Sequence, residues 1–129
     1  MSFLSARKPE RIVVFDFLAE LEVLVITNKK CFDYFIKNNH FPPGHDMEDT
    51  WLDNGRSCML DTAEKVVFFV LFLREHSLRV IVHECTHMVH QICEAKGIPL
   101  TMDNTEIIAY MTDYLVSSVM DIVRPQRKT

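Results

Sequence analysis

The pentapeptide His83-Glu84-Cys85-Thr86-His87 constrains this chain more than any other stretch. It lies in a long run with the apolar periodicity of a helix, so His83 and His87 are expected one turn apart on one face. Two imidazoles placed in this way can bind a single metal ion, and zinc suits such ligands. Glu84 lies about 100° around the helix, where its carboxylate reaches a metal-bound water more easily than the metal. The pattern predicts a zinc site with Glu84 as a base.

A metal-free helix is the competing interpretation of the same residues. In that case His83 and His87 lie on a partly buried helix face and are satisfied by hydrogen bonds. The pentapeptide alone does not separate the two interpretations, because a catalytic zinc site needs a third protein ligand from elsewhere in the chain.

Length and charge limit the class of protein. The chain has 129 residues and 48% apolar composition, which predicts one compact domain over 1–129 with a core of its own. The net charge is −4, and the only basic cluster is Arg124, Arg127 and Lys128. We therefore expect no nucleic acid among its partners.

The cysteines and the apolar runs favour a cytoplasmic location. Cys31, Cys58, Cys85 and Cys93 show no C-x-x-C spacing, so neither a zinc knuckle nor a disulfide framework is expected. The first ten residues lack the apolar segment of a secretory signal. The most apolar run, Val66 to Leu73, is far shorter than the roughly 20 residues that span a bilayer. We expect reduced thiols and no membrane partner.

The pattern along the chain predicts an α+β fold, in which a small mixed sheet carries helices on one face. Strands are expected at 11–17 and 22–27, although a helix over 12–24 competes, and a hairpin is expected from 57–60 and 66–73 with its second strand central. A first helix is expected at 29–38, with Asn28 as its N-cap. A second helix is expected to start at a cap from His76 or Ser77, to run to Lys96 and to stop at Gly97. A third helix is expected at 103–123, ending before Pro125.

Residues 40–56 are the only stretch without periodicity, and this is long for a connection in a compact domain. His45 and Trp51 could line a substrate groove there. Alternatively, Trp51 anchors the loop to the core and His45 is solvated.

Three candidates compete for the third ligand position. Cys93 is expected to point into the core, about 120° away from the two histidines. His90 and Glu94 share a face with His83 but lie one and two turns beyond His87. They are therefore expected to contact the ligands from outside, to line a groove, or to form the polar side of the helix. Glu106 is the strongest candidate, because Gly97 and Pro99 turn the chain and let the next helix return antiparallel to the first.

His83-Glu84-x-x-His87, followed by eighteen residues and then Glu106, resembles the gluzincin group of zinc metallopeptidases. The match covers about Ser77 to Tyr114. The resemblance implies a zincin-like fold with the metal helix followed by a C-terminal glutamate-bearing helix, zinc held by His83, His87 and Glu106, and hydrolysis of a peptide or protein substrate. It also implies a strand at the sheet edge that pairs with extended substrate, supplied by 57–60 or 66–73.

The chain departs from the larger members of that group. Tyr110 stands where the thermolysin-like branch carries an aspartate that orients a ligand histidine. Its phenol could donate a hydrogen bond to an oxyanion or to a ligand histidine, which makes it a candidate catalytic residue, or its ring could pack between helices. Asp113 is a weaker candidate for orienting a ligand. Asp103 to Glu106 also reads as a capping box, in which Glu106 would cap the helix instead of binding metal. A domain of this length is expected to be a small member without the large flanking domains of that group.

Two other functions remain open at this point. A zinc-dependent binding module with a non-catalytic site would use the same scaffold to hold a partner protein. A metal-free helical interaction domain would leave the histidines without a metal.

Overall fold

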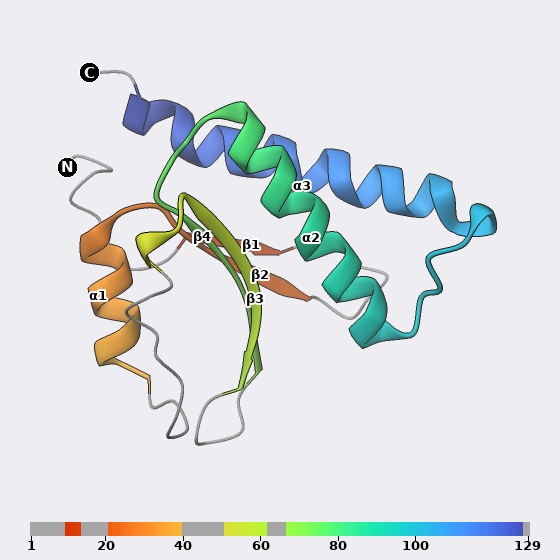
Figure 1. The fold of residues 1–129 in the computed structure, drawn as a ribbon, viewed down its shortest axis with the longest axis horizontal. Helices are drawn as coiled ribbons and strands as arrows, with labels where there is room; N and C mark the ends of the chain where they lie inside the picture. The colour runs from red at the N-terminus through yellow and green to blue at the C-terminus, as the bar shows by residue number, and fades with distance from the viewer. Residues whose placement is uncertain (1–9, 14–20, 40–50, 62–66, 128–129) are drawn as a thin grey trace.

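The computed structural model describes residues 10–13, 21–39, 51–61 and 67–127. Figure 1 shows the elements in chain order. The strands are β1 (Glu10–Val13), β2 (Glu22–Ile26), β3 (Gly55–Asp61) and β4 (Val67–Leu73). The helices are α1 (Lys29–Lys37), α2 (Leu78–Lys96), the short 3₁₀ helix η4 (Met102–Asn104) and α3 (Thr105–Arg127). The α+β class is as predicted.

The four strands form one mixed sheet in the order β1-β2-β4-β3. β2 pairs with β4 in parallel, whereas β1 with β2 and β3 with β4 are antiparallel pairs. The predicted hairpin is confirmed, and β4 is an interior strand as expected. Among the described strands β3 lies at the edge of the sheet, and it precedes β4 and α2 in the chain.

Helices cover both faces of this sheet, so the prediction of helices on one face is wrong (Figure 1). Alternate residues of β4 enter different cores: Leu71 and Leu73 pack with α2 and α3, while Val70 and Phe72 pack with α1. The cause lies in the sequence of β4, Val-Phe-Phe-Val-Leu-Phe-Leu, which offers apolar side chains on both faces. A strand of this kind needs a cover on each side.

The helix boundaries follow the predicted signals. The Asn28 side chain accepts a hydrogen bond from the Cys31 N–H at 2.8 Å and caps α1. The Ser77 side chain caps α2 in the same way through the Val80 N–H, and Gly97 ends α2 with a left-handed backbone at φ 71°.

The competing helix over 12–24 is wrong in its described part, because residues 12–13 and 22–24 lie in strands. α3 continues past Pro125 to Arg127 instead of ending before it. A proline one turn from a helix end removes only one backbone hydrogen bond, so the helix tolerates it. Residues 14–20 and most of the 40–56 loop, with His45, lie outside the described residues.

Trp51 anchors its end of the loop to the core, as one of the two interpretations expected. Its ring centroid lies 5.2 Å from that of Phe32, against the core that α1 covers. Across the part of the chain that the structure describes, none of the helices combines the length and apolar character that a bilayer span requires.

Candidate metal centre

α2 carries the candidate site and is held at its start by two contacts. Ser77 Oγ donates to Glu75 at 2.7 Å while accepting from the Val80 N–H. His76 lies just before the helix, and its Nε2 lies 2.8 Å from the Thr27 carbonyl and 3.0 Å from the Leu73 carbonyl. His76 therefore ties the ends of β2 and β4 to the start of α2 and has a structural role.

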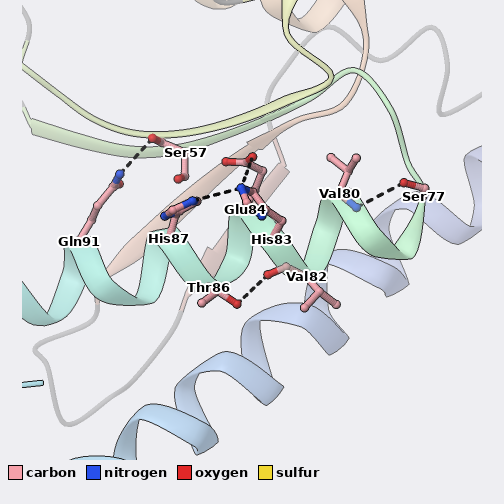
Figure 2. A network of polar contacts seen from close by, with 9 residues as sticks. All are labelled: Ser57, Ser77, Val80, Val82, His83, Glu84, Thr86, His87 and Gln91. Atoms are coloured by element: carbon pink, nitrogen blue, oxygen red, sulfur yellow. Dashed lines mark hydrogen bonds and ion pairs between the residues drawn. The ribbon is translucent and has the colours of Figure 1, made fainter. Parts of the chain in front are cut away.

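His83 and His87 converge as the helix spacing predicts. Their Nε2 atoms lie 3.2 Å apart, and the rings meet edge to face with centroids 4.6 Å apart. Figure 2 shows both on the side of α2 towards β3, with Val82 and Thr86 on the opposite side. Two nitrogens that each lie about 2.05 Å from a tetrahedral zinc ion are about 3.3 Å apart. The separation of the two nitrogens is close to that value, and it is also the length of a hydrogen bond between the two rings.

Glu84 lies at the base of the site. It is one of the few buried polar or charged residues of the described chain, and its side chain is 11% exposed, whereas that of His83 is 65% exposed. Its Oε2 lies 3.9 Å from His83 Nε2. The carboxylate is therefore adjacent to the imidazole pair but turned inward.

Gly55 lets the edge strand approach Glu84 closely. A Cβ atom at this position would lie 2.6 Å from Val80 Cγ1 and 2.9 Å from Glu84 Cγ, distances that side-chain atoms do not tolerate. The strand start is held by two further contacts, since the Glu75 N–H donates to the Asn54 carbonyl at 2.9 Å and Arg74 to the Asn54 side chain at 3.0 Å. Glu84 is thus covered by backbone at a glycine.

A groove of about 1000 Å³ lies between α2 and the start of β3. His83, Glu84 and His87 line it, together with an apolar wall from α2 and a polar rim before β3. The lining residues are Asp53, Asn54, Gly55, Leu78, Arg79, Val80, Val82, His83, Glu84, Thr86 and His87. An apolar wall beside a few convergent polar groups is typical of a ligand-binding site.

Cys58, Cys85 and Cys93 are free thiols, as predicted. Burial, and secondarily the Glu84 carboxylate, raises the pKa of Cys85 to about 12, so this thiol stays protonated inside the motif. Burial also raises the pKa of Cys93, which points into the core as expected and is not available as a ligand.

Glu106 and Tyr110 lie on α3, and the structure does not bring Glu106 into a ligand group with the two histidines. Among the described residues, no three His, Cys, Asp or Glu side chains are arranged to hold a metal ion. Glu106 is exposed at the start of α3, and in the described part of the chain it makes no capping bond to Asp103. Tyr110 is 57% exposed and its ring lies near Tyr114, so it does not pack between helices.

Two residues of the site did not stand out in the sequence. Gly55 is part of an Asn-Gly pair, which signals a turn but not a close approach to Glu84. Gln91 follows His87 by one turn, and its amide reaches the edge strand at Ser57.

Comparisons of this chain with protein-family models, with curated proteins and with solved structures find no match to any of them.

Proposed function

We propose that this chain is a zinc-dependent metallopeptidase of the zincin-like type, with His83, His87 and Glu106 as metal ligands. The observation that carries the proposal is the 3.2 Å separation of the two imidazole nitrogens, which matches two ligands of a tetrahedral zinc ion. It is supported by the position of Glu84 beside that pair and by the groove that both line. The spacing of the motif to Glu106 adds to it.

Each residue has a separate role in this proposal. His83 and His87 bind the metal with Nε2, and bound zinc would lower the pKa of a water and polarise the scissile carbonyl. Glu84 is the carboxylate beside the two histidines that would take up a proton from water and return it to the leaving amine. Tyr110 is proposed to donate a hydrogen bond to the oxyanion or to a ligand histidine.

Glu106 requires a movement of the start of α3 to complete the site. The first turn of α3 follows η4 and an exposed connection, and Leu100, Met102 and Ile107 are all exposed around it. Few apolar contacts hold this end, whereas the later turns of α3 bury Met111, Leu115, Val119 and Val123.

The test compares zinc content and peptide hydrolysis in protein purified without a histidine tag. The parent should hold about one zinc per chain. Glu84→Gln should keep the zinc and lose hydrolysis, because it retains the shape but not the base. Glu106→Gln should lose much of the zinc, while the exposed acid on the same helix, Asp121→Asn, should not.

Zinc well below one equivalent in the parent would eliminate the proposal. A Glu84→Gln variant as active as the parent would remove Glu84 as the base, and a Glu106→Gln variant with full zinc would remove Glu106 as a ligand.

A zinc-dependent binding module is the second candidate. The observation that favours it is the lack of a third ligand next to His83 and His87 among the described residues. The discriminating result is zinc at one equivalent without hydrolysis of any peptide. A fourth side chain on the metal would also favour this module, because a catalytic site keeps one position for water.

A further inference from the structure

Gln91 joins the metal helix to the edge of the sheet. It lies one turn beyond His87, and its Nε2 donates to the Ser57 carbonyl of β3 at 3.1 Å (Figure 2). The residues that line the groove end at His87, so this contact lies directly beyond the groove.

The Ser57 carbonyl points to the open side of β3. The Asn54 carbonyl accepts a hydrogen bond from the Glu75 N–H and therefore faces the side of β4. Within β3, the Ser57 carbonyl accepts the Gln91 amide from outside the β3–β4 pair, and because carbonyl directions alternate along an extended strand, those of Gly55 and Met59 face the same side as that of Ser57. β3 is an edge strand, and the outward groups of an edge strand can pair with another extended chain.

The other half of the Gln91 amide is unsatisfied. Oε1 is buried and has no hydrogen-bond partner in the described part of the chain. Turning the amide over would not help, because Oε1 would then face the Ser57 carbonyl oxygen. Burial of an unpaired polar atom costs free energy, and this cost offsets the hydrogen bond that Nε2 makes to Ser57. The Gln91 side chain can therefore leave this position at little net cost.

We propose that the Gln91 amide occupies, in the free protein, the place that a backbone N–H of an extended peptide takes on the Ser57 carbonyl, and that it competes with that peptide. The inference rests on the proposed function only in identifying that peptide as the substrate. A primary amide donates the same N–H group as a peptide bond, so the Gln91 contact marks where pairing starts. When Gln91 swings away, its Oε1 reaches solvent and the groove opens along β3 beyond His87.

Peptide binding without turnover tests this proposal. The assay uses metal-free protein in a Glu84→Gln background and a fluorescein-labelled heptapeptide of alternating Val and Thr, followed by fluorescence anisotropy. Gln91→Ala should bind this peptide roughly two- to tenfold more tightly than the same background with Gln91, because one competing hydrogen bond is gone. Backbone amide signals of Ser57 and Met59 should shift on binding.

Two controls keep the result specific. Lys96→Ala, an exposed change on the same helix, should leave the affinity unchanged. A heptapeptide methylated on alternate backbone nitrogens should show no gain, since it cannot donate to the Ser57 carbonyl. If Gln91→Ala does not fold, Gln91→Glu decides, because its carboxylate cannot bridge to a carbonyl and should produce the same gain.

Equal or weaker binding by the Gln91 variants would overturn the inference, and so would a gain for the methylated peptide or amide shifts outside β3. None of these measurements requires zinc or hydrolysis. A gain in binding would therefore uphold the role of Gln91 even if the separate zinc analysis of the parent eliminated the peptidase.

Discussion

At the scale of single residues, the candidate site depends on a missing side chain. Gly55 allows β3 to approach α2 over Glu84, and a Cβ there would meet Val80 and Glu84 below 3 Å. Glu84 and Val80 are both buried, so their side chains cannot move aside easily to make room for an added Cβ. The close contact between strand and helix is therefore specific to glycine at this position.

Gly55→Ala should lower the free energy of unfolding by about 1–3 kcal/mol, the usual cost of overpacking, and should displace Glu84. Urea unfolding measures the first effect and the loss of hydrolysis the second. Gly97→Ala is the matched control: nothing lies within 4 Å of its added Cβ, and the cost of about 1 kcal/mol comes from the positive φ alone. A Gly55→Ala protein with parental stability would contradict the close approach.

The Cys93 thiol links stability to alkaline pH. Burial raises the pKa of this thiol above its ordinary value of 9.0, so the folded protein keeps the proton that the unfolded chain releases. Its contribution is complete below pH 9 and is lost as the pH rises through the folded pKa.

Above pH 9, the free energy of unfolding of the parent should fall more steeply than that of Cys93→Ala, by up to about 1.4 kcal/mol per pH unit. The difference in slope is the measurement, because the alanine variant also leaves a small cavity that lowers stability at every pH. Parallel slopes would show that the thiol has the same pKa in both states.

At the scale of elements, α2 is positioned by its two ends. Ser77 caps the first turn, and Gly97 allows the Ile98 N–H to bond to the Cys93 carbonyl at 2.8 Å at the other end. These signals are local in sequence, which is why the bounds of α2 could be predicted closely. The same holds for Asn28 and α1.

Ser77→Ala should destabilise the protein by about 1 kcal/mol, the usual cost of losing an N-cap. Thermal unfolding measures it, with Ser77→Thr expected to recover most of the loss. Because the first turn of α2 lines the groove, the alanine variant should also bind zinc more weakly than Ser77→Thr. Equal stability of the alanine and threonine variants would rule out a contribution from this cap.

At the scale of the whole molecule, β4 is shared by two cores. Phe72 belongs to the core under α1, whereas its neighbours Leu71 and Leu73 belong to the core under α2 and α3. Neither core can lose β4 without exposing the other, so the two faces should unfold together.

Trp51 is the only tryptophan and packs against Phe32 on the α1 side, while most helical residues lie in α2 and α3 on the other side. Urea transitions followed by tryptophan fluorescence and by far-ultraviolet circular dichroism should therefore coincide. Phe72→Ala should shift both by about 3–5 kcal/mol. Separate midpoints would mean that the cores unfold independently.

The sequence by itself determined the parts that depend on neighbours along the chain. The helix spacing placed His83 and His87 together, the caps bounded α1 and α2, and the apolar run of 67–73 identified the interior strand, because all three depend on short-range geometry. Glu106 was chosen by spacing alone, and its role as a ligand stays a prediction.

Only the tertiary structure decided which faces of the sheet the helices cover and what closes over the site. The apolar pattern of β4 permits a cover on either side, and the choice depends on packing between residues far apart in the sequence. For the same reason, nothing local indicated that Gly55 would lie against Glu84 or that Gln91 would reach Ser57. Those contacts arise where β3 meets α2, and Ser57 and Gln91 are 34 residues apart in the sequence.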